Sequence, residues 1–363
     1  MKPHLWTRLL LVIGLGASIA APLASVPASA APANAYVVHD LVSDGAHPAD
    51  TIDPNLVNAW GLTAGPTTPW WVADNGTDLS TLYTAAGVKV PLEVQVDGGP
   101  TGAVFNGTAN FVVSNGTASG PALFLFASED GAIRGWNPGV PLPAPSHQAQ
   151  VAVDRSAAGA IYKGLAIAST SAGDFLYATD FHNGRVDVFD GSFNLVSTPG
   201  AFTDPGLPTG YAPFGIQTIG AQIFVSYAKQ DADREDEIGG HSLGFVDVFD
   251  VSGAFQGRVA TRGQLNAPWG LALAPDSFGR FAGDLLVGNF GDGGIHAYQL
   301  LDGTWVPQGP LRGTDGMPIA IDGLWALEFG HGAANNGPTD TLFFTAGPDD
   351  ESHGLFGTIR AAG

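Results

Sequence analysis

The sequence predicts an all-β fold, a six-bladed β-propeller that forms a single domain over residues 31–363. Three observations support this prediction. The composition is rich in turn residues and poor in charge, with 51 Gly, 26 Pro and 13% charged residues, as expected for short strands joined by tight turns. No sustained helical period occurs after residue 30. Instead, one phrase of strands and glycine turns recurs along the chain.

Each repeat has a small or aromatic residue, a glycine and an aliphatic residue, then a turn, an apolar strand, a glycine turn and an alternating strand. Anchored on the residue before the aliphatic one, the six repeats begin at Gly61, Gly102, Gly164, Gly215, Gly270 and Ala326. Their spacings are 41, 62, 51, 55 and 56 residues, which is the range for a propeller blade of four strands. Six copies therefore predict six blades.

A spare strand, "YVVHDLV" at residues 36–42, precedes the first repeat. We expect it to complete the last blade and close the ring, because closure removes an open sheet edge. A seven-bladed ring is the alternative, with "TANFVVSNG" at residues 108–116 as a degenerate extra element. The sequence favours an extra hairpin inside the second blade.

Residues 1–30 predict a signal peptide. Lys2 and Arg8 precede an apolar run, and the tripeptide "ASA" at residues 28–30 is a small-x-small cleavage site. We therefore expect a secreted protein, extracellular, or periplasmic if the source is Gram-negative. The chain has no cysteine, which excludes disulfides, thiol catalysis and cysteine-ligated metals.

The formal net charge of -20 makes nucleic acid and anionic membranes poor partners. No run after the signal peptide approaches the length of a membrane helix. We expect a monomer whose partner is a small molecule, a glycan or a protein.

The residues just before each glycine–aliphatic pair should form a ring at one channel mouth, because inner propeller strands begin there. These residues are Trp60, Thr101, Lys163, Phe214, Trp269 and Trp325. The aromatic members are candidates for stacking on a sugar or another flat ligand. The alternative, which the sequence favours, is that they are wedges between blades. Lys163 is the exception, a cation among aromatic residues.

The last residues of the second strands should form another ring, made of Asp74, Ser128, Asp180, Tyr227, Asn289 and Ala346. Tyr227 is a further ligand-binding candidate. The Asp and Asn members more simply bond turn backbone N–H groups.

Two loops carry motifs with a possible chemistry. "QDADREDE" at residues 230–237 places Asp231, Asp233 and Asp236 where they could hold calcium, which prefers several oxygen ligands; a solvated insertion is the favoured reading. "GHSLG" at residues 240–244 matches a nucleophile elbow, but a strand rather than a helix follows it, which argues against Ser242 as a nucleophile.

Several long phrases carry a resemblance to a known family: "DPNLVNAWGL", "YATDFHNGRVDVFD", "APWGLALAP" and "DLLVGNFGDGGI". Over about residues 36–359 the chain resembles a family of exported bacterial proteins of unassigned function, some of which carry a PEP-CTERM sorting tail. This chain ends in "RAAG" without such a tail, which implies free secretion. In its repeat unit the family is similar to NHL-type and gluconolactonase-type propellers, a likeness of fold that implies no reaction.

Gluconolactonase-like propellers hold a channel metal with Glu, Asn and Asp. The resemblance implies Asn58, Asp180 and Asn289 as counterparts here, while the first blade offers no obvious Glu. His182, in the loop after Asp180, is a candidate base.

Two functions follow from these residues. The first, which we favour, is a non-enzymatic binding module for a carbohydrate, small ligand or protein. The alternative is a metal-dependent hydrolase or lyase of the lactonase or esterase type, with Asp180 and His182 near a channel cation. The metal set is incomplete and no nucleophile–base pair is evident, so the binding module is the better hypothesis.

Overall fold

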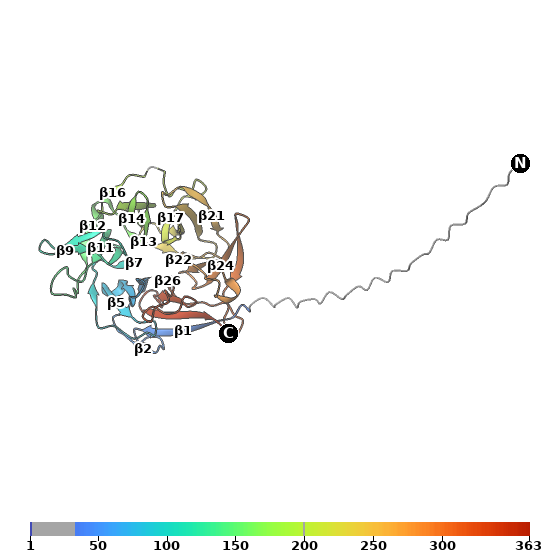
Figure 1. Cartoon of the computed structure of the whole chain (residues 1–363), viewed down its shortest axis with the longest axis horizontal. Helices are drawn as coiled ribbons and strands as arrows, with labels where there is room; N and C mark the ends of the chain where they lie inside the picture. Colours follow the sequence, from blue (N-terminus) through green and yellow to red (C-terminus); the bar gives the residue numbers. More distant parts are fainter. Residues whose placement is uncertain (2–32, 199) are drawn as a thin grey trace. The chain divides into compact units, whose positions relative to one another are not determined.

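The computed structural model describes Met1, residues 33–198 and residues 200–363. The predicted signal peptide therefore lies, Met1 apart, outside the described residues. Six sheets, antiparallel except for the two outermost strands of the last one, surround a central channel (Figure 1), so the prediction of a six-bladed propeller is confirmed. No helix in the described part of the chain has the length and apolar character needed to cross a membrane.

The first three blades are given from the inner strand outward. Blade 1 comprises β3 (Ala59–Thr63), β4 (Trp70–Asp74), β5 (Leu79–Tyr83) and β6 (Val94–Gln95). Blade 2 comprises β7 (Pro100–Phe105), β10 (Phe124–Ser128), β11 (Ala132–Trp136) and β12 (Gln150–Asp154). Blade 3 comprises β13 (Tyr162–Thr170), β14 (Gly173–Asp180), β15 (Arg185–Asp190) and β16 (Leu195–Val196).

The other three blades follow the same order. Blade 4 comprises β17 (Tyr211–Ile219), β18 (Gln222–Gln230), β20 (Phe245–Asp250) and β21 (Phe255–Thr261), with β19 (Glu237–Ile238) also paired to β18. Blade 5 comprises β22 (Pro268–Leu273), β23 (Leu285–Asn289), β24 (Ile295–Leu301) and β25 (Thr304–Pro310). Blade 6 comprises β26 (Leu324–Phe329), β27 (Leu342–Ala346), β28 (Leu355–Ala361), β1 (Tyr36–Ser43) and β2 (Thr51–Ile52). Three short 3-10 helices complete the elements: η1 (Asn75–Thr77), η2 (Ser156–Ala158) and η3 (Gly279–Phe281).

The N-terminal strand closes the ring, as the sequence predicts. β1 pairs antiparallel with β28, with Tyr36 opposite Ala361, so the first and last strands of the propeller share blade 6 (Figure 1). The seven-bladed alternative is wrong. Its extra element is a hairpin off blade 2, formed by β8 (Val112–Ser114) and β9 (Ser119–Pro121), which pair only with each other.

The recurring glycine is explained by the way the inner strands meet. Each inner strand contacts the next around the ring, and β26 contacts β3. A Cβ atom at Gly215 would overlap the carbonyl oxygen of Trp269 in the next blade, and one at Gly61 would overlap that of Thr101. A side-chain hydroxyl also ties two of these inner strands together, since Thr101 of β7 donates to the carbonyl of Tyr162 of β13 at 2.8 Å. Glycine at these positions therefore permits close approach of neighbouring backbones.

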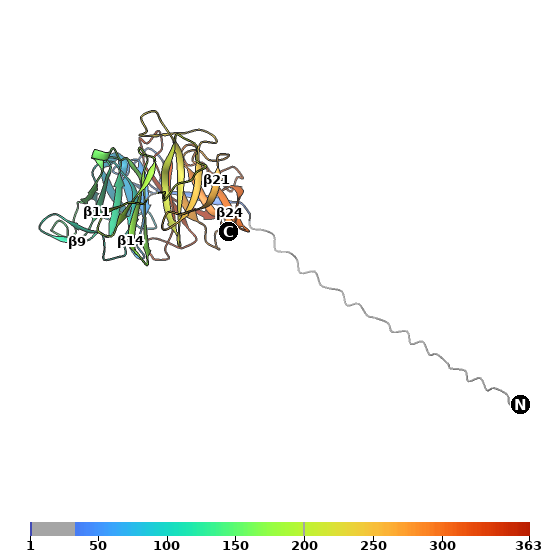
Figure 2. The same ribbon diagram turned by 90° about the horizontal axis from the view of Figure 1, so that it is seen from above.

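The apolar core lies mainly between blades, which stand roughly edge-on in Figure 2. Six clusters of buried apolar side chains each combine residues of two adjacent blades. A seventh cluster fills part of the channel. Between the first and second strands of each blade, the register shifts near the residue that precedes the glycine. Such bulges re-aim side chains, and the residues at them include Trp60 and Lys163.

Candidate functional site

The channel end at which the inner strands begin is called the Lys163 mouth. The register places the end of each second strand beside it, since Tyr162 pairs with Asp180 and Pro268 with Asn289. In five blades the residue that follows the second strand reaches this mouth, namely Asn75, Glu129, Phe181, Phe290 and Gly347. In blade 4, where β18 is longer, the equivalent residue is Ala228, inside the strand. Each of the six contacts either the polar network or the aromatic cluster described below.

Lys163 is a buried cation at the centre of this mouth, with 1% of its surface exposed. Its Nζ lies 2.5 Å from Oε1 of Glu129 and 3.1 Å from Oδ1 of Asp236, and 5.2 Å from the ring centroid of Trp60. Burial lowers the pKa of Lys163, but the carboxylates of Glu129, Glu237 and Asp236 outweigh burial and raise it above its usual value. Lys163 is therefore a fixed positive charge and not a nucleophile or base.

A chain of amide and carboxylate hydrogen bonds extends from Lys163 around the mouth. Asn75 donates to Oε2 of Glu129 at 2.9 Å, and Asn58 donates to Oδ1 of Asn75 at 3.1 Å and to Oε2 of Glu351 at 2.5 Å. Trp325 donates from Nε1 to Oδ1 of Asn58 at 2.9 Å. The network joins blades 1, 2 and 6 to Lys163 of blade 3. Fully satisfied polar networks of this kind hold their members in one geometry.

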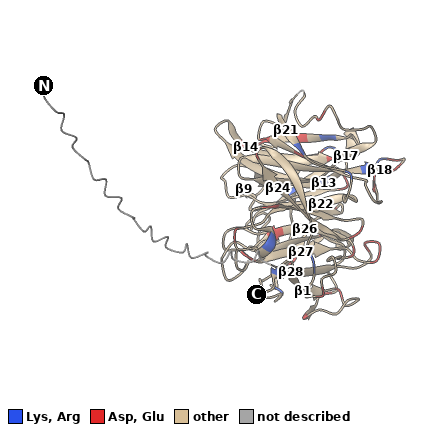
Figure 3. Cartoon of the chain, turned by 90° about the vertical axis from the view of Figure 1, so that its right-hand side faces the viewer, with Lys and Arg blue, Asp and Glu red and all other residues tan. Residues whose placement is uncertain are grey.

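The carboxyl groups at this mouth outnumber its ammonium group. β19 holds the long loop of blade 4 against β18, which brings Asp236 and Glu237 toward Lys163. Burial raises the pKa of Glu237 to about 8, although Lys163 opposes the shift, and burial raises the pKa of Glu351 as well. These two groups hold their protons to higher pH than ordinary carboxyl groups do. Figure 3 shows how sparsely the charged residues are distributed over the rest of the ribbon.

The raised pKa of Glu237 predicts a pH dependence of stability. The unfolded chain loses this proton near pH 4.5 and the folded chain near pH 8, so the stability that Glu237 contributes is fully present below about pH 4.5 and is lost as the pH rises through about 8. We expect the melting temperature of Glu237→Gln to fall less than that of the wild type as the pH is raised from about 4.5 to about 8. Parallel melting profiles of the two proteins, measured by circular dichroism, would contradict the assignment.

The aromatic ring residues fill the channel instead of facing a ligand. Trp60 and Trp325 stack at 3.7 Å between ring centroids, and Phe214 meets Trp325 edge-on at 5.9 Å. These three side chains are at most 1% exposed, so they have no free ring face on which a ligand could stack. They pack on one another across the channel and not as wedges between blades. Trp269 is partly exposed and donates from Nε1 to the carbonyl of Lys163 at 3.0 Å.

Two other sequence candidates lie apart from this cluster. Tyr227 is buried among apolar side chains of blades 3 and 4, so it is a wedge and not a ligand-binding residue. His182 lies in the loop after β14, where its backbone carbonyl is 3.4 Å from Nε2 of Gln230. No hydrogen bond between described residues joins the His182 ring to Lys163 or its carboxylates.

The three candidate channel ligands for a metal have separate partners. Asp180 accepts from the backbone and side chain of Asn183 at 3.2 and 2.7 Å, and Asn289 accepts from the backbone of Asn266 at 3.2 Å. Both therefore stabilise turns, as the simpler interpretation of the sequence proposes. Asn58 belongs to the network above. Within residues 33–198 and 200–363, no group of three or more His, Cys, Asp or Glu side chains is arranged to hold a metal ion.

The acidic loop also separates its members. Asp231 accepts from the backbone N–H of Glu235 at 3.0 Å, Asp233 is exposed, and Asp236 pairs with Lys163. The three do not form a calcium cradle because Asp236 is drawn to the ammonium group. Ser242 is partly exposed beside His241 and, as the sequence indicates, is followed by a strand, β20.

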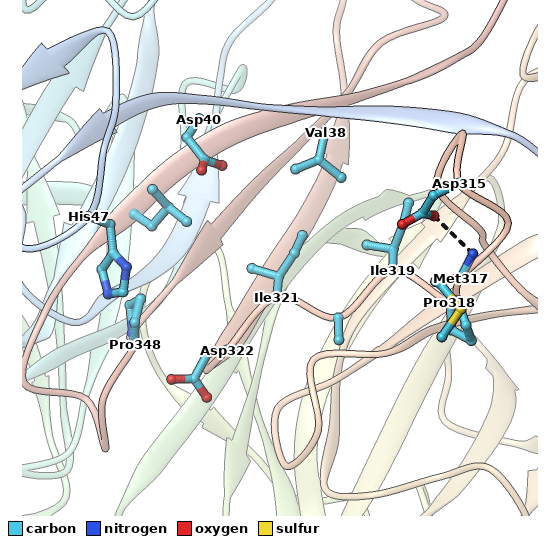
Figure 4. A pocket seen from close by; sticks show the side chains of 13 residues that line it. Val38, Asp40, His47, Asp315, Met317, Pro318, Ile319, Ile321, Asp322 and Pro348 are labelled. Carbon is cyan, nitrogen blue, oxygen red and sulfur yellow. Dashed lines mark hydrogen bonds between the residues drawn. The ribbon is translucent and has the colours of Figure 1, made fainter.

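A separate cavity, of about 340 Å³, lies away from the channel beside β1 and the loop that precedes β26 (Figure 4). Ile319, Ile321 and Val38 give it an apolar wall, with His47 and Asp322 at one side. The carboxylates of its loop already accept hydrogen bonds from the backbone. Asp322 accepts from the N–H of Asp349 at 2.9 Å, and Asp315 accepts from the N–H of Met317 at 2.9 Å. The Lys163 mouth has the denser set of charged groups and is the better candidate.

Solved structures with this fold span most of the chain. An aldose sugar dehydrogenase from Streptomyces coelicolor, solved with PQQ bound, has a TM-score of 0.52 at 15% identity and covers 91% of this chain and 99% of its own. The apo aldose sugar dehydrogenase from Escherichia coli has a TM-score of 0.54 at 12% identity, with coverages of 90% and 100%. A Bacteroides thetaiotaomicron protein of unknown function reaches 0.56 at 11% identity, with coverages of 90% and 76%. At these identities the likeness shows the propeller fold alone.

Sequence relatives are found in Acanthamoeba polyphaga mimivirus, while no family model matches the chain. "Uncharacterized protein R648" is 35% identical over 337 residues, covering 89% of this chain and 80% of the viral protein. "Uncharacterized protein L690" is 33% identical over 339 residues, with coverages of 89% and 85%. The kinship with exported bacterial proteins and their sorting tail stays a prediction. The chain belongs to one protein family with these two mimivirus proteins.

Proposed function

We propose that this chain is a secreted binding protein that holds a small amino-bearing carbohydrate at the Lys163 mouth, without catalysing a reaction. The observation that carries the proposal is the charge balance of the mouth. Four carboxyl groups, those of Glu129, Asp236, Glu237 and Glu351, surround a single ammonium group.

The chemistry of the mouth fits hydroxyl and ammonium groups. Asp236 is exposed and Glu351 is partly exposed, so both can accept hydrogen bonds from a ligand above the buried Lys163. Hydrogen bonds between charged partners are the stronger ones, which favours an ammonium group beside these carboxylates. Phe290, which is partly exposed, supplies apolar surface for a sugar ring. The fixed charge on Lys163 argues against a role as a nucleophile.

Isothermal titration calorimetry with glucosamine and glucose tests this function. We expect glucosamine to bind on the order of tenfold more tightly than glucose, because one charge-assisted hydrogen bond contributes about 1.5–3 kcal/mol. Glu351→Gln should remove this preference. The matched control is Glu328→Gln at the opposite channel end, which should leave the preference unchanged.

Three results would overturn the proposal: equal affinity for the two sugars, binding of neither, or an equal loss in the control variant. Titration with Ca²⁺ alone separates a calcium site from a sugar site. Calcium binding that Glu351→Gln abolishes, without sugar binding, would assign the mouth to the metal.

A second function is favoured by the raised pKa of Glu237, which keeps a carboxylic acid protonated near neutral pH beside the mouth. Such a group can act as a general acid, as a lactonase, an esterase or a lyase would need. A panel of lactones and esters tests it. Turnover that Glu237→Gln removes would establish an enzyme in place of the binding protein.

A further inference from the structure

The channel end opposite Lys163 is hollow. A cavity of about 180 Å³ opens there, where the inner strands end. A smaller cavity of about 20 Å³ lies deeper and shares Ala103, Gln217 and Glu328 with it. The smaller cavity is also lined by Trp269, which belongs to the aromatic cluster that fills the channel. We call the larger cavity the Glu328 mouth; the aromatic side chains separate it from the Lys163 mouth.

The walls of the Glu328 mouth combine polar groups with aliphatic side chains. Ala64, Ala103, Val104 and Ile167 are among its lining residues. Among the described residues that line it, Glu328 is the one ionisable side chain. A single carboxyl group in an apolar wall is costly unless it has a partner, because burial disfavours the charged form.

The polar groups of this cavity have hydrogen-bonding capacity left over. Among the described residues, the one side-chain partner of Glu328 is His331, whose Nε2 lies 3.0 Å from Oε1. The Gln217 side chain is partly exposed, lines both cavities and makes no hydrogen bond to a described residue. An amide with free hydrogen-bonding capacity beside a carboxyl group offers a ligand two polar contacts.

We propose that the Glu328 mouth binds a small organic ammonium ion with a short apolar body. The carboxyl group of Glu328 pairs with the ammonium, the amide oxygen of Gln217 accepts a further N–H bond, and the aliphatic side chains of the wall contact the hydrocarbon. The net charge of -20 favours cations over anions at any opening of this surface. Burial raises the pKa of Glu328, and a bound cation offsets that burial.

The volume limits the ligand. At about 30 Å³ for each water molecule, 180 Å³ equals the space of roughly six waters. This suits a ligand of about five to ten non-hydrogen atoms and excludes oligosaccharides and folded protein partners. The site is distinct in position from the proposed sugar site.

The test uses three probes of matched shape, n-butylammonium, n-butanol and butyrate, with binding followed by ligand-observed NMR on the mature protein. We expect n-butylammonium to bind at least tenfold more tightly than n-butanol, and butyrate not to bind. Glu328→Gln should remove the difference between the ammonium and the alcohol. Ala103→Leu, which fills the space shared by the two cavities, should weaken the binding of both n-butylammonium and n-butanol.

Glu351→Gln, at the Lys163 mouth, is the matched control: it removes only n-butylammonium bound at that mouth and should leave unchanged the binding that Glu328→Gln abolishes. Equal binding of the three probes, no binding of n-butylammonium, or retention of its binding in both Glu328→Gln and Ala103→Leu would overturn the proposal. Circular dichroism melts of each variant separate loss of the site from loss of the fold. The outcome is independent of whether glucosamine binds at the other mouth.

Discussion

A chain that begins at Asp53, and so lacks β1 and β2, is expected not to form a stable propeller. β1 buries Tyr36, Leu41 and Val42. At about 1.5–3 kcal/mol for each buried apolar side chain, their loss removes roughly 5–9 kcal/mol, which is comparable with the whole free energy of unfolding of a typical domain, about 5–15 kcal/mol. The loss also exposes β28 as a free edge, which favours aggregation.

The measurement is size-exclusion chromatography followed by a thermal melt. A chain that begins at residue 33 is the control, since it retains every strand and should elute and melt as one folded species. A monomeric, cooperatively melting protein that begins at Asp53 would show that closure by β1 is dispensable.

Lys163→Met is expected to destabilise the protein by about 1–3 kcal/mol, less than the usual cost of breaking a fully buried pair, because the carboxylates of Glu129 and Asp236 that lose their partner keep contact with solvent. The substitution keeps the length of the side chain but removes the positive charge from among Glu129, Asp236 and Glu237. Like charges then face each other in a partly solvated cluster. Chemical denaturation of the variant and the wild type measures the difference.

Calcium gives this variant a second readout. With the ammonium gone, the carboxylates and the oxygen of Asn58 form a set of hard ligands, so millimolar Ca²⁺ should raise the melting temperature of Lys163→Met and not that of the wild type. Lys163→Arg retains the charge and is the control. Equal stability of Lys163→Met and wild type, or a calcium response shared by both, would contradict the role of Lys163 as an internal cation.

The fold could be predicted from the sequence because its glycines mark a backbone requirement. The glycine of the first five repeats lies where one inner strand touches the next, and Ala326 takes this place in the sixth, so the spacing of Gly61, Gly102 and their counterparts counts the blades. The spare strand at residues 36–42 could be assigned for a similar reason, since a ring cannot close without a partner for its last sheet. The extra hairpin, β8 and β9, forms no blade because its two strands pair only with each other.

The site could be predicted only in part. Lys163 was identified as the exception in its ring, and its charge does set the electrostatics of the mouth. Glu129 and Asn75 were not among the predicted mouth residues because that ring was built from the last residue of each second strand. The residue that reaches the mouth is the one after it. Side chains of a strand alternate between faces, so a shift of one position exchanges turn-binding Asp180 for channel-facing Phe181.

Glu351 could not be found by repeat alignment at all. It lies four residues beyond Gly347 in the last blade's turn, a position with no counterpart in the other blades. Its approach to Asn58 depends on a pair of residues 293 positions apart in the chain. Contacts of this kind follow from ring closure and leave no local pattern in the sequence.

The pairing of Tyr36 with Ala361 has a mechanical consequence. Because β1 and β28 are antiparallel, the start of one and the end of the other lie side by side at the same corner of blade 6. A force that pulls the two ends apart therefore loads the backbone hydrogen bonds between these strands one after another, like a zipper, and not all at once in shear. We expect the ring to be weakest under tension at this seam, with the five blades behind it released only after blade 6 has opened.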